Sequence, residues 1–107
     1  MIHKIKPPET REIYNRLKQS AKKRNIEFSL TISELNNLSF PITCPILGVP
    51  LKWHTGKPED DSYSFDRIDT TKGYCIDNIQ VISFKANRAK NNLTQDELEK
   101  FVRFYCS

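Results

Sequence analysis

Two side chains in the second half of the chain have the chemistry of a divalent-metal site. Asp66 supplies a carboxylate from a segment with strand character, and Asn87 supplies an amide from a segment with helical character. A strand hairpin laid against a helix would bring both groups to one small cleft. Their hard oxygen atoms suit a single Mg²⁺ or Mn²⁺ ion and leave other coordination positions for water and phosphate. Metal-assisted phosphodiester cleavage requires such an open site.

A strand, a turn, a second strand and a helix are predicted to position these two groups. The predicted strands cover 63–68 and 79–83, and the helix covers 84–91 with Ser83 as its N-cap. Side chains alternate along a strand, so Phe65 and Asp66 point to opposite faces. The pattern therefore directs the Asp66 carboxylate away from the hydrophobic core.

Helices are predicted on both sides of this unit. Residues 9–24 repeat apolar side chains at intervals of four, as one face of an amphipathic helix would. Capping boxes at Thr31–Glu34 and Thr94–Glu97 predict a short helix to about residue 38 and a terminal helix. Apolar residues follow in the terminal helix at the spacing of a buried stripe, which predicts that they belong to the core: Leu98, Phe101, Val102 and Tyr105.

The length of 107 residues fits one α+β domain with a single modest core. We divide it into a helical part over 1–40, a knuckle and loop over 41–62, the strand–strand–helix motif over 63–92, and a C-terminal helix over 94–106. Hydrophobic residues make up 37% of the chain, which is typical of a folded globular protein. No apolar run is long enough for a signal peptide or a membrane helix, so we expect a cytoplasmic protein without a membrane partner.

Several segments together resemble the HNH endonuclease family in its small phage version. The motif segments are Ser64–Asp69, Lys72–Tyr74, Asp77–Val81 and Lys85–Asn91, and the segments Lys22–Phe28 and Cys44–Gly48 fit the same pattern. The resemblance implies a ββα-metal (HNH, or His-Me finger) core with flanking N- and C-terminal helices. It also implies a metal-dependent endonuclease that cleaves or nicks DNA, in the host cytoplasm if a phage encodes the protein.

Three residues take roles by position in this resemblance. Asp66 and Asn87 would bind the divalent ion, and Asn78 would stabilise the loop between the hairpin and the helix. The residue type of Asn78 supports the same role, because a short amide side chain can bond neighbouring backbone groups.

The residue after Asp66 departs from the family pattern. Members of the family carry there a histidine that activates water as a general base, whereas this chain has Arg67. A guanidinium stays protonated, so Arg67 can clamp phosphate oxygens but cannot accept a proton. The alternatives are His54 in the preceding loop, Asp69 as a weak base or further ion ligand, or a metal-bound hydroxide whose proton is lost to solvent.

The family's structural zinc site is a second departure. Many relatives bind zinc through two Cys-x-x-Cys pairs, but here Cys44 alone remains, with Leu47, Ser83 and Ala86 at the other three positions. One thiolate cannot sustain a tetrahedral site, so no structural zinc is expected. We expect Cys44, Leu47 and Ala86 to form a small apolar cluster instead.

The charge of +4 suits a nucleic-acid partner without requiring one. Four basic residues are predicted to surround the cleft and contact DNA phosphates: Lys72, Lys85, Arg88 and Lys90. A second basic stretch on the first helix, Lys18 and Lys22–Arg24, is as consistent with a solvated face as with DNA contact. The missing histidine also permits an alternative function, a non-catalytic nucleic-acid-binding domain that retains the fold.

Overall fold

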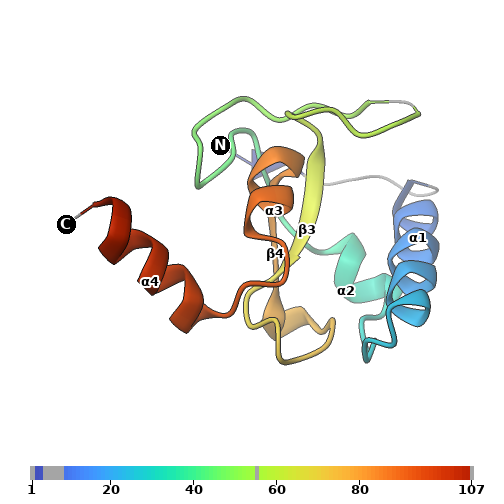
Figure 1. The fold of residues 1–107 in the computed structure, drawn as a ribbon. Helices are drawn as coiled ribbons and strands as arrows, with labels where there is room; N and C mark the ends of the chain where they lie inside the picture. The colour runs from blue at the N-terminus through green and yellow to red at the C-terminus, as the bar shows by residue number, and fades with distance from the viewer. Residues whose placement is uncertain (1, 4–8, 55, 107) are drawn as a thin grey trace.

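The candidate site is carried by a hairpin of two strands, β3 and β4, and by helix α3, which follows β4 directly (Figure 1). The computed structural model describes residues 2–3, 9–54 and 56–106. Over these residues the protein is an α+β domain with four α-helices and short antiparallel strand pairs. The elements in chain order are β1 (Ile2–His3), α1 (Glu9–Lys23), α2 (Ile32–Asn36), β2 (Phe40–Pro41), β3 (Tyr63–Arg67), a 3-10 turn (Ile76–Asn78), β4 (Ile79–Ser83), α3 (Phe84–Lys90) and α4 (Gln95–Tyr105). Among the described residues, no helix is both long and apolar enough to cross a membrane.

The hairpin and the helix after it confirm the predicted strand–turn–strand–helix unit to within one residue at each end. In the antiparallel register Phe65 lies opposite Val81 and Asp66 lies opposite Gln80. The side chain of Ser83 accepts a hydrogen bond from the main-chain N–H of Ala86, so it is the N-cap of α3 as predicted. The turn from strand to helix therefore needs no linking residues.

Helices α1 and α2 lie on one side of the hairpin, and α3 lies on the other (Figure 1). The α1 side holds most of the hydrophobic core, in two clusters of buried residues: Leu35, Phe40 and Val81, and Ala21, Leu30, Tyr74 and Ile79. Both predicted capping boxes are present, at Thr31 before α2 and at Thr94 before α4. The pairing of β1 with β2 was not predicted, because two-residue strands have no periodicity to detect.

A close backbone contact joins the segment after α1 to the turn between the two strands. The main-chain N–H of Tyr74 donates to the Glu27 carbonyl at 2.8 Å, and the N–H of Ser29 donates to the Tyr74 carbonyl at 2.9 Å. A β-carbon at Gly73 would lie 2.3 Å from the Glu27 carbonyl oxygen. Glycine is therefore required at position 73 for the two segments to meet.

The knuckle over 41–51 packs against the far side of the hairpin through Cys44. This thiol is 2% exposed and shares a cluster with Leu51, Ile82 and Ala86. The prediction that Cys44 and Ala86 share an apolar cluster is confirmed. The prediction for Leu47 is wrong: this side chain is 46% exposed, because Leu51 fills the cluster and only the main-chain N–H of Leu47 faces the thiol.

The predicted burial of the terminal helix is also wrong. Helix α4 has the predicted caps and apolar spacing, but none of its residues is buried. In Figure 1 it extends away from the rest of the domain beyond α3. Spacing shows that a helix has an apolar face, but it does not show what covers that face.

Candidate functional site

Asp66 is buried on the α3 side of the hairpin. Strand alternation turns its carboxylate away from the hydrophobic core, as predicted, yet the residue is only 3% exposed because polar side chains cover it. The opposite residue, Gln80, donates a hydrogen bond from Nε2 to Asp66 Oδ2 at 2.8 Å. A buried carboxylate needs charge or hydrogen-bond partners, and Gln80 supplies only one of them.

The second partner of Asp66 is Lys90, in the last turn of α3. Its ammonium lies 2.9 Å from both carboxylate oxygens and 2.6 Å from the main-chain oxygen of Arg67. The side chains of Lys90 and Asp66 are 11% and 3% exposed, so this is a buried ion pair. Lys90 was predicted to contact DNA at the surface, whereas the structure directs it inward onto Asp66.

Asn87 and Asp66 line the same cleft, whose volume is about 240 Å³. The side-chain nitrogen of Asn87 donates to Ser64 Oγ at 2.7 Å and to the Phe65 carbonyl at 3.1 Å. These bonds hold the NH₂ end of the amide against β3, so Oδ1 is the end left to bind a cation. The predicted proximity of the two groups is therefore seen in the structure.

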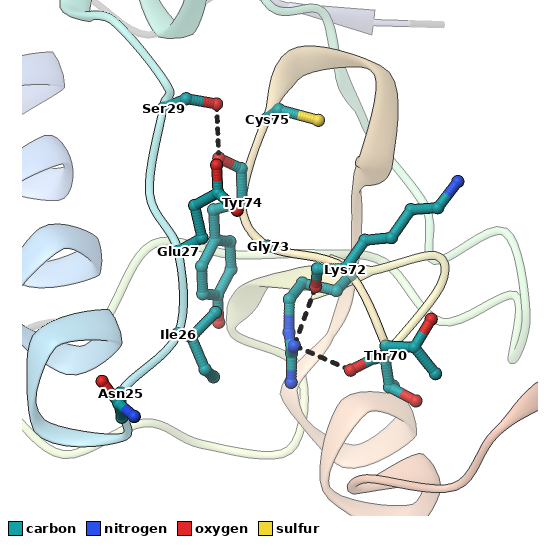
Figure 2. Close-up of a pocket in the computed structure, with 11 residues that line it drawn as sticks. Asn25, Ile26, Glu27, Ser29, Thr70, Lys72, Gly73, Tyr74 and Cys75 are labelled. Carbon is teal, nitrogen blue, oxygen red and sulfur yellow. Dashed lines mark hydrogen bonds between the residues drawn. The ribbon is translucent and has the colours of Figure 1, made fainter.

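Arg67 is held at the edge of this cleft by the turn that follows β3. One guanidinium nitrogen donates to the carbonyls of Thr70 and Lys72, both at 2.9 Å, and the group lies 5.6 Å from the ring centre of Tyr74. Arg67 and Lys72 also line a second, larger cleft of about 540 Å³. Figure 2 draws this cleft and marks the bonds to Thr70 and Lys72 with dashed lines. A guanidinium has five N–H donors, and these two bonds use two of them, although the residue is only 9% exposed.

Asn78 ties together the turn between the two strands. Its side-chain oxygen accepts from the N–H of Asp69 at 2.8 Å, and its nitrogen donates to the carbonyls of Asp69 and Gly73 at 3.0 and 2.9 Å. The residue is buried. These three bonds fix the turn that holds Arg67.

Asp69, a candidate base, does not line the Asp66 cleft. The hydroxyl and then the main-chain N–H of Thr71 donate to its carboxylate, at 2.6 and 2.9 Å, and hold the pKa of Asp69 below its usual value. A carboxylate with a lowered pKa is a weaker proton acceptor. The structure thus places Asp69 beside the turn, with both bonds from Thr71 made to its Oδ1.

His54, the other candidate base, lies in the loop before β3 and is also absent from the lining of the Asp66 cleft. Its Nε2 is 2.6 Å from Asp61 Oδ1. The structure therefore does not bring His54 together with Asp66 and Asn87. Among the cleft-lining residues, only Asp66 carries a side chain that can readily accept a proton.

The other basic residues divide into those beside a cleft and those away from it. Arg88 lines the Asp66 cleft and forms an exposed ion pair with Asp60 at 3.0 Å. Lys72 lines the larger cleft, and Lys85 is exposed on α3 but lines neither. Arg24, the first residue after α1, lines the Asp66 cleft and donates to the hydroxyl of Tyr74 at 3.2 Å, whereas the basic residues of α1 line neither cleft.

Sequence reasoning missed the two side chains that contact the Asp66 carboxylate, Gln80 by a hydrogen bond and Lys90 by an ion pair. Gln80 follows Asn78 by two residues on β4, and the hairpin register alone would have placed it opposite Asp66. Lys90 lies one turn after Asn87 on the same helical face, so a cation beside the proposed ion site was detectable from spacing.

No family model, curated protein or solved structure matches this chain.

Proposed function

We propose that the Asp66 cleft binds the phosphodiester backbone of DNA and hydrolyses it with one divalent ion, Mg²⁺ or Mn²⁺. The hairpin and α3 would then be a ββα-metal core of the HNH type. The observation that carries this proposal is the joint presence of Asp66 and Asn87 in one cleft lined also by Arg24, Arg67 and Arg88. A carboxylate and an amide can hold a cation there while the arginines bind phosphate.

The surroundings of Asp66 fit a bound cation. The Lys90 ammonium lies among the two carboxylate oxygens and the Arg67 carbonyl, which are hard oxygen atoms of the kind that Mg²⁺ and Mn²⁺ prefer. These oxygen atoms already stabilise the positive charge of Lys90. A divalent ion would be held by Asp66 and by Oδ1 of Asn87, and Lys90 would have to leave the carboxylate first.

Held by Asp66 and Asn87, the ion would supply Lewis acidity to the phosphoryl group and would lower the pKa of the attacking water. The protein orients the backbone through Arg88 and Arg24, and Arg67 stabilises the charge that develops on the phosphate oxygens. Arg67 cannot take the proton from water. Since Asp66 would be engaged with the ion, no other cleft-lining side chain accepts that proton, and it passes to bulk solvent.

A plasmid-nicking assay with Mn²⁺ tests the proposal. Asp66→Asn keeps the shape of the side chain but removes the charge that binds the ion, so its nicking rate should fall at least about a hundredfold, a typical loss for an essential catalytic contact. Glu99→Gln makes the same change at an exposed position of α4 and should nick like wild type. Equal nicking by wild type and Asp66→Asn would refute the role of Asp66.

The buried Lys90–Asp66 pair favours a second candidate function, a DNA-binding domain without catalysis. In this case the Lys90 ammonium permanently occupies the place of the divalent ion, and Arg67 occupies the place of the histidine base. Fluorescence anisotropy with a DNA duplex should then show salt-dependent binding that Asp66→Asn retains and Arg88→Ala weakens, with no cleavage under Mg²⁺ or Mn²⁺. Metal-dependent product that is lost in Asp66→Asn would exclude this candidate.

A further inference from the structure

Helix α4 presents large apolar side chains to solvent. Phe101 is 51% exposed, Phe104 is 76% exposed and Tyr105 is 74% exposed, and the helix extends away from the domain (Figure 1). A soluble domain rarely leaves neighbouring aromatic residues uncovered without a partner for them. The face is therefore suited to binding another molecule.

The exposed residues form a shallow groove of about 330 Å³ that is both apolar and charged. It is lined by Leu93, Glu97, Lys100, Phe101, Phe104 and Tyr105. Glu97 and Lys100 lie one turn apart on the groove side of the helix. Within the chain Lys100 pairs with Asp96 at 3.3 Å, but both side chains are about two-thirds exposed, so this pair is weak and can exchange.

We propose that the occupant of this groove is a second copy of the same chain, packed with its α4 antiparallel. A two-fold axis between residues 98 and 99 places Glu97 of each copy opposite Lys100 of the other. The same axis places Leu93 opposite Phe104, so the groove contains one charged pair and one apolar pair that match themselves. A two-fold interface requires this self-complementarity.

The size of the groove indicates a weak dimer. Aromatic side chains can bury about 150–250 Å² each, and the three here are at least half exposed. They would therefore bury roughly 400 Å² per copy, about half of the usual contribution from one partner in a stable complex. We expect a dissociation constant on the order of 10 µM.

Sedimentation of the full chain from about 1 to 200 µM tests this proposal across the expected dissociation constant. Wild type should shift from monomer to dimer over this range. Phe104→Ser should remain monomeric, because it removes the side chain that covers Leu93. Wild type that stays monomeric throughout, or Phe104→Ser that still dimerises, would overturn the proposal.

Charge variants of the same helix test the antiparallel register. Lys100→Glu places two carboxylates opposite each other and should weaken the dimer at least about tenfold. Arg103→Glu makes the same charge change outside the groove and should dimerise like wild type. Adding Glu97→Gln to Lys100→Glu should restore part of the affinity, since glutamine also completes a capping box.

Circular dichroism of each variant measures whether α4 still forms. If Lys100→Glu and Arg103→Glu weaken the dimer equally while both keep their helix, the proposed pairing of Glu97 with Lys100 is wrong. If the double variant dimerises no better than Lys100→Glu, the pairing is likewise wrong.

Discussion

The knuckle cluster around Cys44 and the cleft around Asp66 are two positions where the family resemblance implies a metal, and this chain fills them differently. At Cys44 the space is occupied by the carbon side chains of Leu51, Ile82 and Ala86. At Asp66 it is occupied by the ammonium of Lys90, a cation on a flexible stem. Carbon atoms cannot be exchanged for an ion, but an ammonium can. Added metal should therefore bind at the Asp66 cleft but should not bind at the knuckle.

The thiol of Cys44 accepts several hydrogen bonds within and beside the knuckle. Burial raises its pKa, but hydrogen bonds from the Ser83 side chain and from the main-chain N–H groups of Leu47, Ser83 and Ile46 outweigh that effect and leave the pKa below its usual value. The N–H groups of Ser83 and Leu47 lie 3.3 and 3.5 Å from the sulfur. Main-chain donors thus stabilise the sulfur in this protein.

The largest effect should follow the removal of Lys90. Lys90→Met leaves the buried Asp66 carboxylate without its counter-charge and should lower the free energy of unfolding by about 3–5 kcal/mol. Mn²⁺ should restore part of this loss by taking the vacated position. Urea unfolding with and without Mn²⁺ measures both effects.

Lys85→Met is the matched control, since Lys85 lies exposed on the same helix. It should cost less than about 0.5 kcal/mol and show no response to Mn²⁺ beyond that of wild type. If Lys90→Met and Lys85→Met were equally stable, the buried ion pair would not hold α3 on the hairpin.

A slightly smaller effect is expected at the knuckle. Ile82 is fully buried, and Ile82→Ala should lower the free energy of unfolding by about 3 kcal/mol through the cavity that it leaves. Neither Zn²⁺ nor a chelator should change the size of this loss, because we expect packing and the hydrogen bonds to Cys44, rather than a metal, to hold this region. Ile46→Ala, at a position 57% exposed in the same knuckle, should change stability little. Stabilisation by Zn²⁺ that persists in Asp66→Asn would contradict the comparison of the two regions.

Cys44→Ala tests the same region with a smaller expected loss of stability. It removes the sulfur that accepts hydrogen bonds from the main-chain N–H groups of Ser83 and Leu47, among others, and should cost about 1–2 kcal/mol. The melting temperature of wild type should be the same with and without a chelator. A chelator-dependent fall in wild type that disappears in Cys44→Ala would mean that the thiol binds a metal.

The smallest effect concerns the turn beside the cleft. Thr71→Val removes the hydroxyl that donates to Asp69 and should raise the pKa of that carboxyl toward its ordinary value. Because the folded pKa is lowered, the contribution of Asp69 to stability is present above the unfolded pKa and is lost as the pH falls through the folded pKa. Thr71→Val should shrink this acid-dependent change. NMR titration of Asp69 measures the shift, with Thr70→Val as the control, and an unchanged pKa would reject the assignment.

Local sequence patterns were sufficient to predict most elements of the fold. Two kinds of feature depend only on neighbouring residues and can be read from the sequence. They are the helix caps at Ser83, Thr31 and Thr94 and the alternation of side chains through Asp66. The proximity of Asp66 and Asn87 followed from the strand–strand–helix order. These features need no knowledge of how distant segments pack.

The rest depended on packing that one sequence does not specify. Whether Lys90 points outward or onto Asp66 depends on the rotation of α3 against the hairpin. Whether Leu47 or Leu51 fills the knuckle cluster depends on the path of a turn that contains a positive-φ glycine, Gly48. The exposure of Phe101 depends on what lies beside α4, which periodicity does not report.

The most direct test of the exchangeable cation position is Mn²⁺ binding followed by electron paramagnetic resonance of the free ion. Wild type should bind one Mn²⁺, and Asp66→Asn should bind it at least about tenfold more weakly, because the charged ligand is gone. Equal binding by the two proteins, or no binding by either, would contradict the account that Asp66 holds a cation position shared by Lys90 and a divalent ion.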